Sequence, residues 1–496
     1  MRASLYRLYC ILALLSIGTA GWCSAAQKHA PPSSVDVLML SDLHFDPFYD
    51  PAKIPELRRA PITAWPAILI RPDSSTRLSV FSDLQRECDV RGTDSPWPLV
   101  AASLHEAKRQ EPAPLFVTLS GDLLAHGFIC KFRRLDPSAT PAEASAFAAK
   151  TVAFLAEQLY IAYPSTPIYF ALGNNDSGCG DYFETPDSAF LKSAASSFAK
   201  DIPDPQTRST IGASFLHLGD YSVLLPAPMH DTRLIVVQDI FQSAHYKACN
   251  GQSDSTAAVE QNSWLRKQLS EARANGEQVW VMTHIPPGVD VYTTYHRYLF
   301  APGEACNVKQ PQMFLSSTAL ADTIAEFGDV VRLAIFAHTH MDEIKLLHGP
   351  GDLAVPAKLV PSISPINGNE PSFLVAQVVP QTATMKDYEV LSAVNAQGAV
   401  WNREYRYSAV YGLPDFSASS VQQLTSHLID DKTGEDGTSR AYERFFLAGG
   451  GTFASLGLQR LWPAYSCSLR EFDPAAFHTC MCPAAAAQPA TAPPTH

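Results

Sequence analysis

The chain has 496 residues, a formal net charge of -12 and an apolar fraction of 46%. Its length allows one large domain plus a smaller one, and its apolar fraction excludes a globally disordered chain. Because the charge is acidic and no basic block is present, we expect no binding of a nucleic-acid polymer through phosphate contacts.

The N-terminus has the pattern of a secretory signal peptide, predicted over residues 1–26. Arg2 and Arg7 precede an apolar core at residues 8–17, and small residues at 24–26 offer a cleavage site. The alternative is a membrane anchor, but the apolar run is too short to span a bilayer well. We therefore expect a secreted or periplasmic protein without a transmembrane anchor.

Eight of the ten cysteines lie beyond the predicted signal peptide. An even number of cysteines in an exported chain predicts disulfides. Spacing alone does not determine their pairing, and the preferred pairs are Cys249 with Cys306 and Cys467 with Cys480.

Five apolar runs are predicted as buried strands, at residues 35–40, 115–119, 167–172, 279–282 and 330–336. Each run ends at side chains that can bind a metal; in chain order these are Asp42, His44, Asp122, Asn174, His284, His338 and His340. A single such residue is more often an ordinary loop carboxylate or a surface histidine. The repetition at five strand ends indicates one common site, because layered α/β folds place ligands there.

The segments between these runs have less distinctive sequence patterns. Residues 47–98 are rich in proline and turn residues, and we expect a long insertion that could form a wall of the substrate site. Helices are predicted at 99–108, 139–160 and 264–274, and a further strand at 234–237.

Aspartate offers a hard oxygen and histidine a borderline nitrogen, a mixture that suits zinc, manganese or iron. Asp122 follows Gly121, where the backbone can approach a ligand closely, and its carboxylate could bridge two ions.

The motifs Asp-x-His, Gly-Asp, Gly-Asn-x-Asp, His and His-x-His, in this order, resemble the calcineurin-like metallophosphoesterases. Residues 119–126, 283–288 and 338–343 are similar to the acid sphingomyelinase-like phosphodiesterase branch. The resemblance covers residues 35–410 and implies an α/β fold, a calcineurin-like four-layer αββα sandwich with a small, mainly helical C-terminal subdomain.

The resemblance also implies a site for two divalent ions, expected to be zinc, with manganese or iron as alternatives. One ion would be held by Asp42, His44 and His340, the other by Asn174, His284 and His338, with Asp122 between them. Two such ions lower the pKa of a shared water, and the resulting hydroxide attacks phosphorus.

One position departs from the family pattern. The family usually has Gly-Asn-His where this chain has Gly173-Asn174-Asn175, and asparagine cannot carry a proton at neutral pH. We therefore assign the role of acid or phosphate contact to His126, with Asn175 as a hydrogen-bond donor beside it.

The expected organisation is a signal peptide at 1–26, a catalytic domain at 33–410, a disulfide-containing subdomain at 411–482 and a disordered tail at 483–496. Within the subdomain we expect helices at 421–429 and 439–447, followed by a loop-rich segment that carries the last cysteines.

The predicted function is an exported two-metal phosphoesterase that hydrolyses phosphodiester or phosphoanhydride bonds of nucleotide-like or sphingomyelin-like substrates by metal-activated hydroxide. A saposin-like module does not fit between Gln27 and Asp42, which favours small soluble phosphoesters over a lipid headgroup. The alternative is a catalytically weak, metal-bound protein that binds phosphoesters. We expect a monomer.

Overall fold

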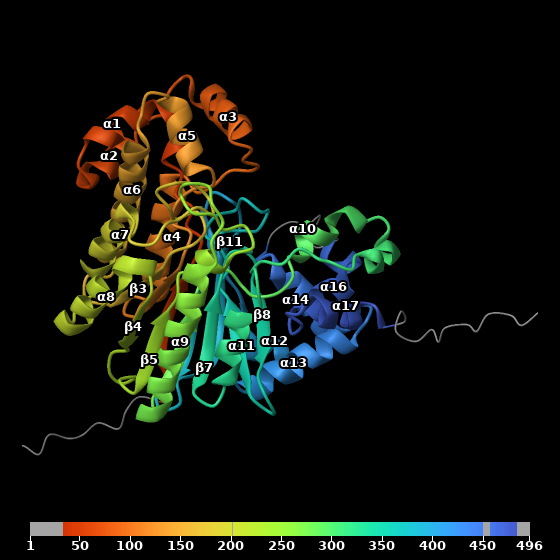
Figure 1. Ribbon diagram of the computed structural model, residues 1–496. Helices are drawn as coiled ribbons and strands as arrows, with labels where there is room; N and C mark the ends of the chain where they lie inside the picture. The colour runs from red at the N-terminus through yellow and green to blue at the C-terminus, as the bar shows by residue number, and fades with distance from the viewer. Residues whose placement is uncertain (1–32, 201, 450–456, 484–496) are drawn as a thin grey trace, which may run out of the picture. The chain divides into compact units, whose positions relative to one another are not determined.

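The computed structural model describes residues 33–200, 202–449 and 457–483 (Figure 1). The predicted signal peptide and residues 484–496 of the predicted tail lie outside this described part. Every predicted strand and helix that carries or precedes a candidate site residue lies within it.

Two six-stranded sheets form the centre of the fold. The first sheet has the order β12-β11-β10-β1-β2-β3, and its strands are β1 (Val35–Leu40), β2 (Val117–Ser120), β3 (Ile168–Ala171), β10 (Ser372–Val379), β11 (Thr384–Ala393) and β12 (Trp401–Arg406). The second has the order β4-β5-β6-β7-β9-β8, with β4 (Tyr221–Leu224), β5 (Thr232–Val236), β6 (Gln278–Met282), β7 (Val331–Phe336), β8 (Glu343–His348) and β9 (Ala354–Leu359). In each sheet the strands that precede site residues run parallel, so their carboxyl ends meet at one edge.

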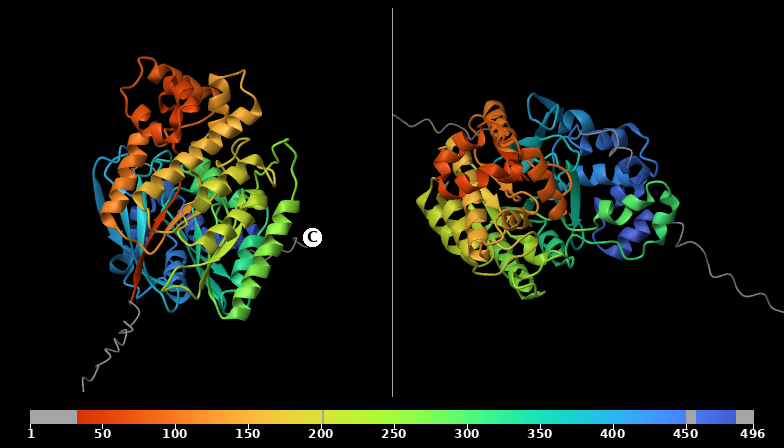
Figure 2. Two further views of the ribbon diagram at one scale, coloured as in Figure 1. Left: turned by 90° about the vertical axis from the view of Figure 1, so that its left-hand side faces the viewer. Right: turned by 90° about the horizontal axis from the view of Figure 1, so that it is seen from above.

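The sheets pack face to face, with helices on their outer faces, as the alternation in β6 shows. Trp280 and Met282 point into the core shared with the first sheet, whereas Val279 and Val281 join the core under α9 (Thr256–Asn275) and α11 (Ala319–Glu326). Helices α4 (Trp97–Gln110), α6 (Pro141–Ala162), α7 (Ala189–Lys200) and α8 (Pro205–Leu218) lie on the other side (Figures 1 and 2). The predicted four-layer αββα sandwich is confirmed.

The expected irregular insertion at residues 47–98 is largely helical. It forms α1 (Ile54–Arg59), α2 (Trp65–Leu69) and α3 (Arg77–Glu87), which lie with α5 (Phe128–Leu135) beyond one end of the sheets (Figures 1 and 2). Several prolines of this segment occupy the first turn of a helix, where a missing N–H costs nothing, so they start helices rather than break them. A disulfide between Cys88 and Cys130 joins α3 to α5.

The C-terminal part is mainly helical, as expected, and only the segment of the last cysteines is more helical than expected. It contains α12 (Tyr407–Tyr411), α13 (Ala418–Asp430), α14 (Gly437–Phe446), α16 (Trp462–Ser468) and α17 (Pro474–Met481). The segment that carries the last cysteines therefore folds as helices, and its Phe477 packs against Tyr295 of α10 (Val291–Tyr295).

The structure confirms one of the two preferred disulfides and corrects the other. Cys467 pairs with Cys480, as predicted. Cys249 pairs with Cys179, and Cys306 pairs with Cys482. The prediction of Cys249 with Cys306 is wrong because Cys306 lies in the apolar cluster formed by α10, α16 and α17, away from the loop that carries Cys249.

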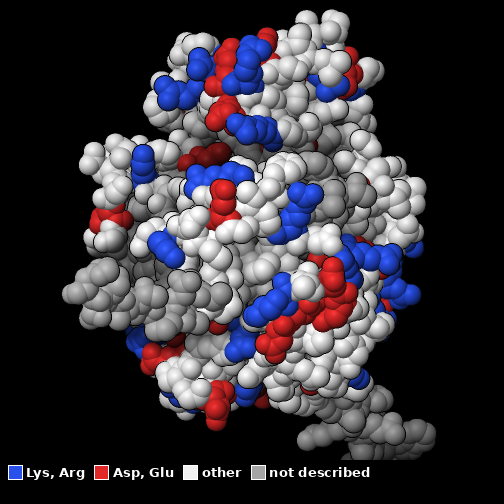
Figure 3. Space-filling model, turned by 90° about the vertical axis from the view of Figure 1, so that its right-hand side faces the viewer, with Lys and Arg blue, Asp and Glu red and all other residues white. Residues whose placement is uncertain are grey.

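No helix among the described residues has the length and apolar character needed to cross a membrane. Acidic and basic side chains are intermixed on the face shown in Figure 3, so this face carries no extended field of one sign.

Candidate dinuclear metal centre

All seven candidate ligands lie immediately after the carboxyl ends of strands, at the edge of the sandwich nearest α1–α3. Five of them have the left-handed backbone conformation, with φ of 47° at Asp42, 39° at His44, 54° at Asp122, 72° at His338 and 70° at His340. Residues with side chains rarely adopt this conformation, and such strain concentrates at functional sites.

The first group of ligand atoms surrounds His44. Its Nε2 lies 3.7 Å from Oδ1 of Asp42, 3.3 Å from Oδ2 of Asp122 and 3.1 Å from Nε2 of His340. Its Nδ1 donates to the carbonyl of Leu124 at 2.9 Å, so Nε2 is the nitrogen that faces the group. His126 is part of this group as well, since its ring stacks on His44 at 4.2 Å.

The second group surrounds His284. Its Nε2 lies 3.1 Å from Oδ2 of Asp122 and 3.2 Å from Oδ1 of Asn174. Its Nδ1 donates to the carbonyl of Ser120 at 2.8 Å, which again fixes the orientation of the ring. His338 completes the group, with its ring centroid 5.3 Å from that of His284. Asp122 belongs to both groups and lies between them.

These residues fit a pair of divalent cations. Both carboxylate oxygens of Asp42 are buried without a hydrogen-bond partner among the described residues, and the same holds for Nδ1 of His340. A buried anionic oxygen without a partner is costly, and a cation would satisfy it. The cluster of histidine and aspartate side chains is thus suited to bind divalent metal.

The electrostatics of the histidines agree with this fit. Burial lowers the pKa of His338 and His340 to about 3, so both are neutral and can act as ligands. Burial opposes protonation of His44 and His284 too, but the carboxylate of Asp122 raises their pKa values to about 9 and about 10. The carboxylates therefore attract positive charge into the site.

Asp176 supports the two loops that carry Asp122 and Asn174. Its carboxylate accepts hydrogen bonds from the backbone N–H groups of Leu123 at 2.8 Å, Leu124 at 2.9 Å and Gly173 at 3.0 Å. Burial, followed by the charge of Asp122, raises its pKa to about 7. The sequence motif contained this aspartate, but nothing in the sequence indicated its role.

Asn175 contacts Asp122. Its backbone N–H donates to Oδ1 of Asp122 at 2.9 Å, and its side-chain Nδ2 donates to Oδ2 at 2.8 Å. Two hydrogen bonds from one residue hold the carboxylate that lies between the two groups, so Asn175 fixes the position of Asp122.

His126 is oriented by a carboxylate that the sequence analysis did not identify. Its Nδ1 lies 3.1 Å from Oδ1 of Asp94, and its backbone N–H donates to Oδ2 of Asp94 at 2.9 Å. Ser364 donates to the same carboxylate at 3.0 Å. Although burial opposes it, the neighbouring His126 lowers the pKa of Asp94. Asp94 lies in the segment expected to be an irregular insertion, where no motif distinguished it.

A third supporting carboxylate lies behind the His284 loop. Asp239 accepts from the backbone N–H groups of Ile285 at 2.9 Å and His284 at 3.4 Å. Burial raises its pKa to about 6. Asp239 lies two residues after the strand predicted at 234–237, and no role was predicted for it.

A sandwich whose strand ends gather imidazoles and carboxylates around a shared aspartate has the architecture of a divalent-metal hydrolase that acts on ester bonds. Comparison with known families agrees, since residues 36–342 match the model of the family described as Calcineurin-like phosphoesterase. The chain belongs to this family, in its acid sphingomyelinase-like phosphodiesterase branch.

Three relatives illustrate the similarity. The human protein named acid sphingomyelinase-like phosphodiesterase 3b is 24% identical over 78% of this chain and 80% of its own length. The Dictyostelium discoideum sphingomyelinase phosphodiesterase D is 24% identical, over 71% of this chain and 74% of its own. The human cyclic GMP-AMP phosphodiesterase SMPDL3A is 21% identical, over 82% and 83%.

Among solved structures, a dimetal phosphatase from Danio rerio has a TM-score of 0.38 and 11% identity, covering 72% of this chain and 96% of that one.

Proposed function

We propose that the protein is a two-metal phosphodiesterase that hydrolyses small phosphodiester or phosphoanhydride substrates. The observation that carries this proposal is the buried carboxylate of Asp42, whose two oxygens have no hydrogen-bond partner among the described residues while facing His44 and His340. In the proposal, one ion is held by Asp42, His44 and His340, and the other by Asn174, His284 and His338, with Asp122 between them.

Zinc is the proposed metal, because imidazole nitrogens predominate in the set and zinc accepts both nitrogen and carboxylate ligands. Manganese and iron are the alternatives, since the same ligands accept them. A bound pair of divalent ions activates a water molecule for attack on phosphorus and neutralises phosphate charge.

We assign protonation of the leaving oxygen and positioning of Asp122 to the protein's own side chains. Because Nδ1 of His126 faces Asp94, its Nε2 is the nitrogen available to the substrate, and we assign it protonation of the leaving oxygen. The side chain of His126 is 31% exposed, so a substrate can reach it. Asn175 is assigned a positioning role through its two hydrogen bonds to Asp122, in place of direct proton transfer.

The names of the relatives support two substrate classes for this chain, sphingomyelin-like headgroup esters and cyclic dinucleotides. Both are phosphodiesters whose ester oxygen becomes an alkoxide on cleavage and needs a proton, as the proposed role of His126 requires.

Turnover of bis-p-nitrophenyl phosphate with added zinc tests the proposal. We expect hydrolysis by the wild type and a loss of roughly a thousandfold in Asp122→Asn, because the carboxylate between the ions is removed while the side-chain shape is kept. Absence of turnover by a protein that contains two equivalents of zinc would instead favour the alternative, a metal-bound protein that binds phosphoesters without cleaving them.

We also propose that the protein is exported and that residues 411–482 act as a scaffold for a catalytic domain at 33–410. Four disulfides support a location in an oxidising compartment. The absence of free thiols in the denatured, unreduced protein purified from its native source is the expected result.

A further inference from the structure

The ring of His340 lacks the support that holds two other candidate ligands. The rings of His44 and His284 are each fixed by a hydrogen bond from Nδ1 to a backbone carbonyl. Nε2 of His340 faces the first group, 3.6 Å from Oδ1 of Asp42, but its Nδ1 is buried without a hydrogen-bond partner among the described residues. Since a metal-binding histidine is usually oriented through its second nitrogen, the position of His340 must be set through its backbone.

The backbone around His340 is strained and has few bonds to the rest of the fold. His338 and His340 have φ of 72° and 70°, and such conformations persist only where the surroundings enforce them. The N–H groups of Thr339 and Met341 donate to acceptors within the same loop. The carbonyl of His340 accepts one hydrogen bond, of 3.3 Å, from Ser362. The loop therefore needs a stronger anchor at one of its ends.

Asp342, two residues after His340, connects this loop to three parts of the fold. Its carboxylate accepts a hydrogen bond from Nζ of Lys358 in β9 and another, of 2.7 Å, from the hydroxyl of Tyr405 in β12. Its backbone N–H donates to the carbonyl of Phe446 in α14 at 2.9 Å. Because β9 and β12 belong to different sheets and α14 to the C-terminal part, Asp342 fixes the loop against all three.

The ion pair of Asp342 and Lys358 is fully enclosed. The two side chains are 1% and 0% exposed, and Nζ of Lys358 also donates to two backbone carbonyls, at 3.0 and 2.7 Å. Phe445 stacks on the ring of Tyr405 at 4.4 Å, which holds the tyrosine from the C-terminal side. The desolvation cost of a buried ion pair offsets most of its attraction, so its main effect here is to fix the groups that it joins.

A second buried pair at the same spacing from a ligand allows a comparison within the molecule. Asp46, two residues after His44, pairs with Lys131 at 2.7 Å, and neither side chain is exposed. The ring of His44, however, has its own hydrogen bond to the carbonyl of Leu124. The two pairs thus share their spacing from a candidate ligand, but only the ring of His44 is also held directly.

We propose that Asp342 is a positioning residue for His340, and that Lys358, Tyr405 and α14 set the affinity of the first metal ion through it. This inference rests on the proposed function, which supplies the bound metal. The C-terminal part of the chain then acts on the metal centre and is more than a scaffold. Because His338 lies farther along the chain from Asp342 than His340 does, the second ion should be affected less.

Stepwise titration of the metal-free protein with zinc tests the proposal. We expect two binding steps in the wild type, and Asp342→Asn should weaken one of them by roughly 10- to 100-fold, the usual cost of removing the support of a ligand. Tyr405→Phe removes only the hydroxyl and keeps the ring on Phe445, so it should weaken the same step by a smaller factor. Asp46→Asn makes the same change at the same spacing and should leave both steps nearly unchanged.

Two further measurements separate positioning from a general loss of structure. Urea denaturation with a chelator present compares the stability of the metal-free variants. Tyr163→Phe is the control for Tyr405→Phe, because Tyr163 is also buried and its hydroxyl donates to Glu111, which lies before β2 and away from the site. Cadmium-113 NMR observes each bound ion separately, and Asp342→Asn should shift or broaden one of the two resonances.

The outcomes distinguish this inference from the proposed function. Weaker binding in one step for Asp342→Asn and Tyr405→Phe, but not for Asp46→Asn or Tyr163→Phe, would support the inference even in a protein that hydrolyses no phosphodiester. Zinc affinity in Asp342→Asn equal to that of the wild type overturns it, even if the wild type is an active phosphodiesterase. Equal losses in Asp342→Asn and Asp46→Asn also overturn it. If Asp342→Asn does not fold, the comparison of Tyr405→Phe with Tyr163→Phe gives the answer in the same way.

Discussion

Gly173 shows how tightly single residues are constrained at the strand ends. A Cβ at this position would lie 2.0 Å from Oδ1 of Asp122 and 2.5 Å from its backbone nitrogen. Only glycine lets the loop of Asn174 approach the aspartate that lies between the two ligand groups.

Gly173→Ala should therefore displace Asp122 and lower metal affinity by roughly 10- to 100-fold, the usual cost of disturbing the support of a ligand. Equilibrium dialysis with zinc measures this. Gly212→Ala, inside α8, is the matched control. A Cβ at Gly212 would lie 3.8 Å from the Cβ of Ala199, an ordinary contact. Unchanged metal affinity in Gly173→Ala would contradict the placement of Asp122.

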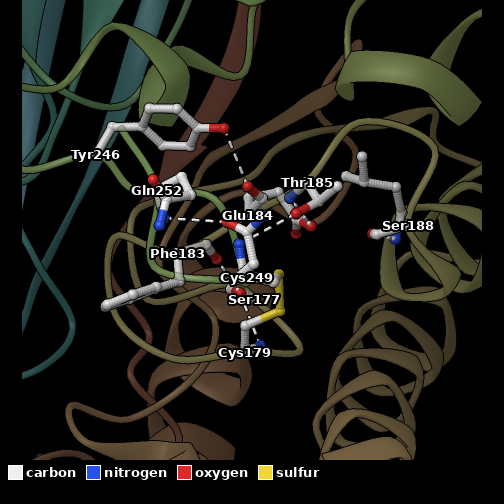
Figure 4. Close-up of a disulfide and its surroundings, with 11 residues drawn as sticks. Ser177, Cys179, Phe183, Glu184, Thr185, Ser188, Tyr246, Cys249 and Gln252 are labelled. Atoms are coloured by element: carbon white, nitrogen blue, oxygen red, sulfur yellow. Dashed lines mark hydrogen bonds between the residues drawn. A yellow bond between two sulfur atoms is a disulfide. The ribbon is translucent and has the colours of Figure 1, made fainter. Parts of the chain in front are cut away.

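Glu184 makes the stability of the protein depend on pH. Its side chain is buried beside the Cys179–Cys249 disulfide (Figure 4), and burial raises its pKa from 4.5 to about 7. Between these values the unfolded chain releases the proton while the folded protein keeps it. The contribution of Glu184 to stability is thus fully present below pH 4.5 and falls as pH rises to about 7, above which it is lost.

Glu184→Gln removes this titration. The free energy of unfolding of the variant minus that of the wild type should be larger at pH 8 than at pH 4. The increase should be on the order of 3 kcal/mol, the free energy of that pKa difference. Urea denaturation at the two pH values measures it. The same substitution at Glu271, which is exposed on α9, is the control. An equal effect of Glu184→Gln at both pH values would show that Glu184 is not buried as a neutral acid.

The candidate ligands could be predicted from the sequence, but their supports could not. Asp42 and His338 follow apolar runs, and position after a strand is visible in a sequence. Asp94, Asp176 and Asp239 act by accepting backbone N–H groups from distant loops, which leaves no pattern along the chain. For the same reason, the sequence could not show that Asn175 binds Asp122.

At the scale of elements, apolar runs predicted the strands well because the sandwich buries both faces of its central strands. Residues 47–98 were predicted poorly because proline marks both loops and first turns of helices, and only the fold distinguishes the two. Only one of the four disulfides, Cys467–Cys480, was predicted, since pairing depends on which elements pack together rather than on spacing.

The disulfides should differ in how much they stabilise the protein. Cys179–Cys249 spans 70 residues and Cys467–Cys480 spans 13. In the chain-entropy model, closing these loops contributes roughly 4 and 3 kcal/mol. Denaturation of the two paired Cys→Ser variants should therefore show the larger loss for Cys179 with Cys249, and the reverse order would contradict this reasoning.

At the scale of the whole molecule, the site joins the two sheets. Asp42, His44, Asp122 and Asn174 follow strands of the first sheet, whereas His284, His338 and His340 follow strands of the second. Metal bound by both sets would link the two halves of the sandwich and stabilise it against unfolding.

Zinc at a hundredfold excess over its dissociation constant should raise the free energy of unfolding by about 2.7 kcal/mol for each site filled. Thermal unfolding with zinc and with a chelator measures the difference. Asp122→Asn should show little response to zinc. If the wild type and this variant respond equally, zinc binds elsewhere.

The left-handed backbone at Asp42, His44, Asp122, His338 and His340 has a consequence for laboratory evolution. Glycine adopts this conformation without strain, so replacing any of the five relaxes the backbone while discarding a ligand. A library selected for heat resistance in the presence of a chelator, where bound metal adds no stability, and without an activity screen, would accumulate glycine at these positions and yield more stable but inactive proteins.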